Sequence, residues 1–234
     1  MSELAIGVTF SSTVISGVFA AHVLRQYIGR RKLHQLAWSL GLVMYSLAAL
    51  AELLSEVLGW STGLYRFYYA LAPSLVAVLG LGSLFLVMDR KFGYAFAAYT
   101  VILFAAFLYV IMTTDVNTAA FVPNTIVGGN GWPSGSAVRT FSPLFTIPGA
   151  ILLIGIAAYS YWKGRQWFNL FIGLGALVVA AGGAMSRLNV PAALYASEFI
   201  GIALMYIGFI KSVEVISKRD TRAVVPAKPT GGGS

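Results

Sequence analysis

The sequence contains no cysteine, and this absence excludes disulfide bonds, thiolate metal sites and cysteine nucleophiles. It contains only two histidines, His22 and His34, and neither has an acidic partner nearby in the sequence. A histidine metal site, a haem site and an imidazole–carboxylate catalytic pair are therefore all disfavoured. No HExxH, GxSxG or Gly-rich phosphate motif occurs either. We expect no metal, no cofactor and no enzymatic activity.

Charged residues are also scarce, making up 10% of the 234 residues, whereas hydrophobic residues make up 58%. The mean hydropathy is +0.80. Soluble domains carry about 25% charged residues, so the solvent that suits this chain is a lipid bilayer. The net charge of +8 comes from short basic groups between apolar runs, which is unlike a nucleic-acid-binding surface. We expect membrane lipid as a partner and no nucleic acid.

Seven apolar runs are long enough to cross a membrane as helices. They cover 4–25, 34–58, 64–88, 92–112, 141–162, 167–186 and 192–211. This pattern predicts an all-α membrane protein, with one seven-helix bundle over residues 1–211. The connection 113–140 is rich in Gly, Pro, Asn and Ser and is predicted to be a loop. Glu3 and the long first run are typical of a membrane helix rather than a signal peptide.

Basic residues predict the orientation of this bundle. Thirteen of the 16 Lys and Arg residues fall on one side of the predicted membrane, and only Arg66, Arg139 and Arg187 fall on the other. The positive-inside rule then puts the N-terminus outside and the basic tail 212–230 in the cytoplasm, with the cell membrane as the location. The tail can contact anionic lipid. Residues 231–234 look like an engineered linker.

A shift of 132 residues superposes the first three predicted helices on the last three without a gap. Residues 40–42 (LGL) then meet residues 172–174 (IGL), and Arg66 meets Glu198. This overlay indicates a possible 3+1+3 internal repeat of parallel halves. Apolar segments of similar length also overlay by chance, so both readings stay open.

Glu52 and Glu56 lie one turn apart near the outer end of the second predicted helix, on one helix face. With a rise of about 1.5 Å per residue, Glu52 lies roughly 9 Å and Glu198 roughly 10 Å inside their helices. Arg66 and Arg187 lie at similar depth. An unpaired charge at the membrane centre costs about 2.5–3.5 kcal/mol or more, so we expect these side chains to face one another around a polar pocket that opens outward.

Hydroxyl side chains of the first helix and one tyrosine of the third join this candidate pocket. The candidate ligand-binding residues are Glu52, Arg66, Glu198, Arg187, Thr9, Ser12, Ser16 and Tyr69. Each type also has a structural interpretation. The charges can form ion pairs or reach headgroup water, the hydroxyls can join helices, and tyrosines such as Tyr69 can form an interfacial belt.

Seven helices with an outer N-terminus resemble rhodopsins and G-protein-coupled receptors in topology. A retinal protein needs a lysine in the middle of the last helix, but the only lysine there, Lys211, lies at the cytoplasmic end. The resemblance therefore implies a receptor-like arrangement of helices, without retinal.

The distribution of polar residues leads to a prediction of function. Charged and hydroxyl residues crowd the outer half, whereas the inner half is mostly apolar, with His22 the main exception. A carrier or channel needs polar groups along its whole path. We therefore expect a receptor-like, sensor-like or partner-docking module that binds a small molecule from outside and acts through a separate protein partner. The alternative is a small-solute or proton-coupled transporter or channel, and an intramembrane hydrolase with paired carboxylates ranks third.

Overall fold

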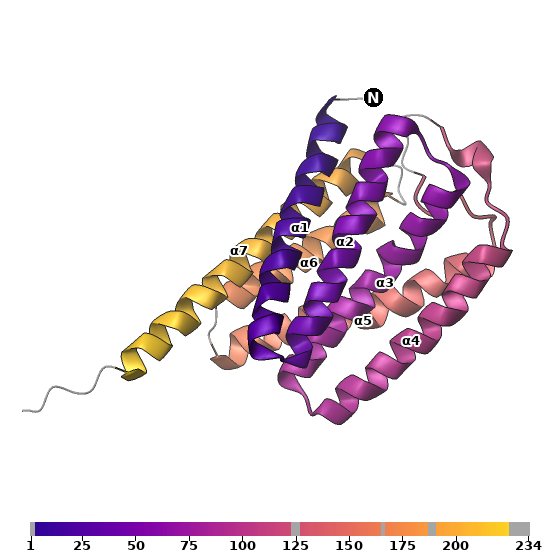
Figure 1. Ribbon diagram of the computed structural model, residues 1–234. Coiled ribbons are helices and arrows are strands. Elements are labelled where there is room, and N and C mark those ends of the chain that lie inside the picture. Colours follow the sequence, from indigo (N-terminus) through magenta and orange to yellow (C-terminus); the bar gives the residue numbers. More distant parts are fainter. Residues whose placement is uncertain (1–2, 123–126, 165–166, 187–190, 225–234) are drawn as a thin grey trace, which may run out of the picture.

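The computed structural model describes residues 3–122, 127–164, 167–186 and 191–224 (Figure 1). Arg187 and the predicted linker 231–234 lie outside these residues. The described part contains seven α-helices and one short 3-10 helix and is all-helical. They are α1 (Glu3–Arg30), α2 (Leu33–Leu58), α3 (Thr62–Val87), α4 (Arg90–Thr113), η1 (Thr118–Ala120), α5 (Ala137–Gly164), α6 (Phe168–Ser186) and α7 (Pro191–Val224).

Each of the seven predicted apolar runs coincides with one helix, and most helices extend a few residues beyond the apolar run. Within the described residues, six helices are long and apolar enough to cross a membrane, and α6 contains a shorter apolar stretch over Phe168–Gly182. The prediction of a multi-pass helical membrane bundle is confirmed at this level.

Tight turns connect the first three helices. Gly59 has a φ of 82°, which glycine adopts without strain, and its N–H donates to the carbonyl of Ser55 at 2.9 Å. The hydroxyl of Ser61 then accepts a hydrogen bond from the N–H of Leu64 at 3.2 Å and caps the start of α3. These turns make α2 and α3 antiparallel neighbours.

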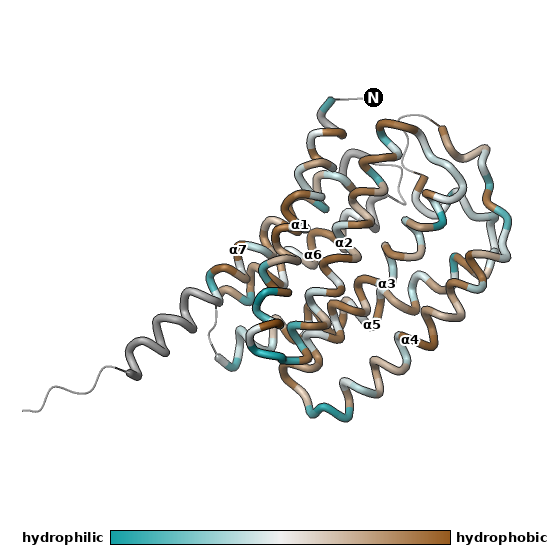
Figure 2. Tube along the Cα trace, viewed as in Figure 1, coloured by the Kyte–Doolittle hydropathy of each residue, from teal (hydrophilic) through white to brown (hydrophobic). Residues whose placement is uncertain are grey.

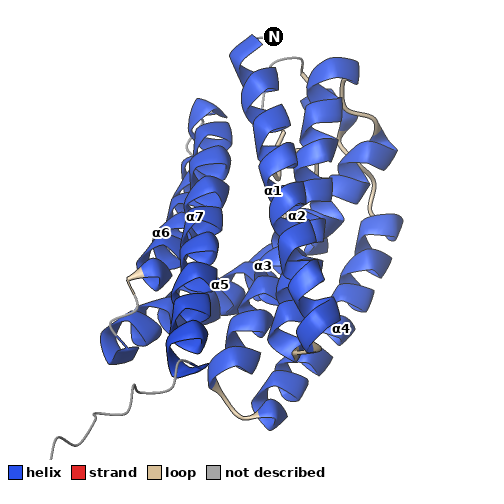
Figure 3. Ribbon diagram, turned by 60° about the vertical axis from the view of Figure 1, so that its left-hand side comes forward, coloured by secondary structure: helices blue, strands red, loops and turns tan. Residues whose placement is uncertain are grey.

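Six of the helices form a closed ring. The neighbouring pairs are α1–α2, α2–α3, α3–α5, α5–α6, α6–α7 and α7–α1, and α4 packs outside the ring against α3 and α5 (Figure 1). A view from another side shows α6 and α7 as a pair beside α1 and α2 (Figure 3). The turns that hold the basic residues 30–32 and 90–91 lie together at the end opposite the N-terminus (Figure 2).

The predicted loop between α4 and α5 is folded against the bundle. We call its described residues 114–122 and 127–136 the cap segment. Tyr65 is fully buried beneath it and donates a hydrogen bond to the carbonyl of Gly128 at 2.7 Å. Trp132 is 1% exposed and its ring lies 5.3 Å from the ring of Tyr65. Tyr65 and Tyr69 therefore belong to an aromatic cluster under the cap rather than to a lipid-facing belt.

Glycines permit close contact between helix backbones. A Cβ atom on Gly149 of α5 would lie 2.5 Å from the backbone of Val76 in α3, and one on Gly80 would lie 2.6 Å from the carbonyl oxygen of Gly149. Gly175 and Gly201 meet in the same way between α6 and α7. Small residues at such crossings are a common means of helix association in membranes.

The α3–α5 crossing gives a stability prediction with a control in the same helix. Gly149→Ala should destabilise the protein by about 1–3 kcal/mol. The methyl group of the introduced alanine would clash with the α3 backbone at Val76, which cannot shift without moving the helix. Gly155→Ala should leave stability unchanged or raise it slightly, since a Cβ there meets nothing within 4 Å. Thermal unfolding in detergent measures both. Equal effects of the two substitutions would contradict the close crossing.

Candidate functional site

Three glutamates converge inside the bundle. Glu52 and Glu56 are 4% and 8% exposed on the inward face of α2, one helical turn apart. Glu198 is half-buried on α7. The side-chain carboxyl groups of Glu52 and Glu198 lie close enough to interact directly. The structure thus brings together the two deepest acidic residues that the sequence singles out.

Three tyrosines surround these glutamates. Tyr195 of α7 donates a hydrogen bond to Oε1 of Glu56 at 2.5 Å. The hydroxyl of Tyr68 in α3 lies beside the carboxyl group of Glu52. Tyr45 of α2 donates to the main-chain carbonyl of Glu198 at 3.0 Å, which ties α2 to α7. We call the six residues the carboxylate–tyrosine cluster: Glu52, Glu56, Glu198, Tyr45, Tyr68 and Tyr195.

The electrostatics of this cluster are unusual because, among the described residues, no basic side chain forms an ion pair with it. The ion pair that these residues contain joins Lys91 and Asp89 at the surface. Two ionised carboxylates in contact repel strongly where the dielectric constant is low. The contact between Glu52 and Glu198 is favourable when one proton lies between their oxygens. The arrangement can therefore take up and release a proton.

Arg66 lies outside the cluster, and no ion pair joins it to Glu198 among the described residues. Its Nη2 donates to the carbonyl of Thr114 in the cap segment at 3.0 Å. The reason is helical geometry. Tyr68 follows Arg66 by two residues, and two residues turn an α-helix by about 200°, so the two side chains leave opposite faces of α3. Arg187, the other predicted cation, lies outside the described residues.

Thr9, Ser12 and Ser16 of α1 are buried, as a role inside the bundle requires, and the Ser12 hydroxyl has no hydrogen-bond partner among the described residues. Thr9 donates to the carbonyl of Ile6 at 3.2 Å, and Ser16 donates to the carbonyl of Ser12 at 2.7 Å. From α2, Ser46 donates to the carbonyl of Thr13 at 3.3 Å and joins the two helices. These bonds match the helix-packing interpretation. A ligand-binding role for Thr9, Ser12 and Ser16 stays a prediction.

The sequence analysis nominated none of these three tyrosines, Tyr45, Tyr68 and Tyr195, for the pocket. A usable signal existed in their spacing. Tyr45 precedes Glu52 by seven residues, and Tyr195 precedes Glu198 by three, so each tyrosine shares a helix face with a glutamate. Tyr69, which the sequence nominated for the pocket, instead packs under the cap segment, with its ring 5.6 Å from that of Trp132.

The Tyr195–Glu56 hydrogen bond gives a second prediction. Tyr195→Phe should destabilise the protein by about 1.5–3 kcal/mol, the range for a hydrogen bond to a charged group. Tyr99→Phe is the control, because the Tyr99 hydroxyl donates to a neutral carbonyl, that of Leu144, at 2.9 Å and is exposed. Its loss should have the smaller effect on the thermal unfolding temperature. The reverse order would show that the cluster does not hold α7 in place.

Comparisons with known proteins do not identify this site. Searches against models of protein families, against curated proteins and against solved structures each find no match. The function is therefore argued from the geometry of the carboxylate–tyrosine cluster and from the packing beneath it.

Proposed function

We propose that the protein is a receptor-like or sensor-like membrane module, without enzymatic activity, that binds a proton at the carboxylate–tyrosine cluster from the outer side. The observation that carries this proposal is the contact between the carboxyl groups of Glu52 and Glu198 with no cation beside them among the described residues. The cluster's polar groups are bonded to one another, which suits a ligand as small as a proton.

The orientation of the site follows from the basic residues. The turns at 30–32 and 90–91 lie at one end of the bundle, whereas Glu52 lies near the end of α2 that faces away from them (Figure 2). The positive-inside rule assigns the basic end to the cytoplasm of a cell membrane. The N-terminus and the cap segment are then outside, and the cluster exchanges protons with the outer side.

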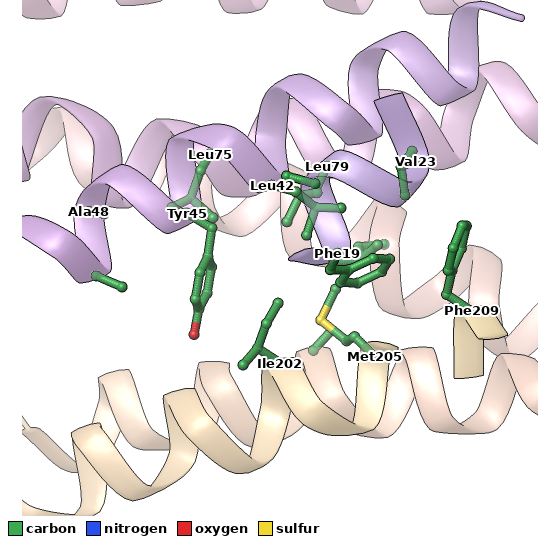
Figure 4. Packing of buried hydrophobic residues seen from close by; sticks show 14 residues of the cluster. Phe19, Val23, Leu42, Tyr45, Ala48, Leu75, Leu79, Ile202, Met205 and Phe209 are labelled. Atoms are coloured by element: carbon green, nitrogen blue, oxygen red, sulfur yellow. The ribbon is translucent and has the colours of Figure 1, made fainter. Parts of the chain in front are cut away.

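The packing below the cluster favours binding over transport. Phe19, Leu42, Leu79, Ile202 and Met205 fill the space between α1, α2, α3 and α7 on the cytoplasmic side of Tyr45 (Figure 4). The cavity of about 30 Å³ among these side chains is lined by apolar residues. A transported proton or solute needs polar groups along its whole path, and this layer supplies none.

A transporter is the second candidate because the ring has a symmetric order of contacts. Exchanging α1–α3 for α5–α7 maps every neighbouring pair onto another pair, with α4 left outside. This order supports the 3+1+3 repeat, and such repeats suit alternating access. Individual contacts do not follow the overlay, however. Gly149 faces α3, whereas its equivalent, Gly17, faces Ser46 of α2 rather than α7.

The orientation can be tested by single-cysteine labelling, which the absence of native cysteine makes unambiguous. A membrane-impermeant maleimide applied to intact cells should label Asn130→Cys in the cap segment and spare Lys218→Cys. Permeabilised cells should label both. Labelling of Lys218→Cys in intact cells would reverse the proposed orientation.

The function can be tested in proteoliposomes and in detergent. Glu52→Gln keeps the shape of the side chain and removes its charge, so it should flatten the pH dependence of the thermal unfolding temperature, as should Glu198→Gln. Glu3→Gln, at an exposed glutamate, should leave that dependence unchanged. An entrapped pH dye should report no proton flux from the wild-type protein.

Two results would count against this proposal. Unchanged pH dependence in both variants would exclude proton binding at the cluster. Proton flux that disappears in Glu52→Gln would replace the receptor-like module with the transporter.

A further inference from the structure

A second cavity lies outside the membrane core, between the cap segment and the start of α5. Its volume is about 640 Å³, and it is broadly open to solvent. The polar and aromatic residues that line it are Asp115, Asn117, Asn130, Trp132, Ser134 and Arg139. None of these residues belongs to the carboxylate–tyrosine cluster, so the cavity is a separate feature of the molecule.

The cavity presents two opposite charges that do not neutralise each other. Asp115 and Arg139 are both exposed, and neither forms an ion pair with any described residue. The side chains of Asn117 and Asn130 add hydrogen-bond donors and acceptors to the wall. A carboxylate and a guanidinium that line one cavity without pairing suit a ligand that carries an ammonium group and an anionic group.

The backbone that carries Asp115 is held in position from α3 and from within the cap. Arg66 binds the carbonyl of Thr114, the residue directly before Asp115, at 3.0 Å. The N–H of Asn117 donates to the carbonyl of Gly131 at 2.8 Å and joins the two walls. A site fixed in advance loses less conformational freedom when it binds.

Hydrogen bonds and packing also fix the wall formed by residues 127–132. Tyr65 donates to the carbonyl of Gly128, and the N–H of Trp132 donates to the carbonyl of Gly129 at 3.2 Å. The Trp132 ring is anchored in the aromatic cluster below, against Tyr65 and Tyr69. The cavity is therefore built on a rigid aromatic base.

We propose that this cavity binds a small zwitterion, with its ammonium group on Asp115 and its carboxylate or phosphate on Arg139. Guanidinium groups bind both kinds of anion through paired N–H donors. A free amino acid and the ethanolamine phosphate headgroup of a lipid share this chemistry. Arg66 is a positioning residue in this site, since it reaches the ligand only through the backbone at Thr114.

Isothermal titration calorimetry on the purified protein tests the site with four probes. L-alanine or O-phosphoethanolamine should bind saturably, whereas propionate and ethylamine, which carry one charge each, should bind at least tenfold more weakly. Asp115→Asn and Arg139→Gln should each weaken zwitterion binding at least tenfold. The control variants Asp89→Asn and Lys91→Gln change charges that are also exposed, at the opposite end of the bundle, and should have no effect.

Two further experiments distinguish a lipid headgroup from a free zwitterion and test the role of Arg66. If phosphatidylethanolamine nanodiscs abolish O-phosphoethanolamine binding and phosphatidylglycerol nanodiscs do not, the ligand is a lipid headgroup; binding in both supports a free zwitterion. Arg66→Gln should weaken binding while leaving the preference over singly charged probes intact. The proposal is overturned if neither zwitterion binds, if singly charged probes bind equally well, or if both pocket variants bind like wild type.

Discussion

The contact between two carboxyl groups inside an apolar bundle is the interaction on which the account of this protein depends. Glu52 and Glu198 meet between α2 and α7, where few water molecules can screen their charge. Ionised together, they would push these helices apart. A shared proton would turn the same contact into an attraction, and Tyr45, which bonds the backbone at Glu198, also links α2 to α7 across the inside of the ring. Protonation of the cluster would thereby be linked to the separation of two helices.

Packing in the rest of the bundle limits which helices can respond to a change in the protonation of the cluster. Below the cluster, a layer of apolar side chains around Phe19, Leu42 and Met205 separates it from the basic end of the molecule. On the far side of the ring, the crossing at Gly80 and Gly149 holds α3 and α5 in backbone contact. A change in the cluster is therefore expressed most readily between α2 and α7. This arrangement suits a module that responds to the proton concentration on the outer side by changing the relative position of α2 and α7.

The sequence allowed the helices to be predicted because apolar length alone defines a membrane span. The sequence also predicted that Glu52 and Glu198 lie close together, because charged side chains at equal depth in a bilayer avoid lipid by facing one another inside the bundle. Arg66 was misplaced because depth says nothing about helix rotation, and its bond to Thr114 needs the cap to be folded. The cap itself could not be predicted. Its order comes from Tyr65 and Trp132, which meet across a long stretch of chain with no periodic pattern.

Infrared spectroscopy of the carboxyl groups tests the shared proton most directly. A protonated carboxyl group has a C=O stretching band separate from the bands of ionised carboxylates, and isotopic exchange to deuterium shifts it. The account predicts that the wild-type protein at neutral pH shows such a band, and that Glu52→Gln and Glu198→Gln each remove or shift it, whereas Glu3→Gln does not. A spectrum with ionised carboxylates alone would contradict the account.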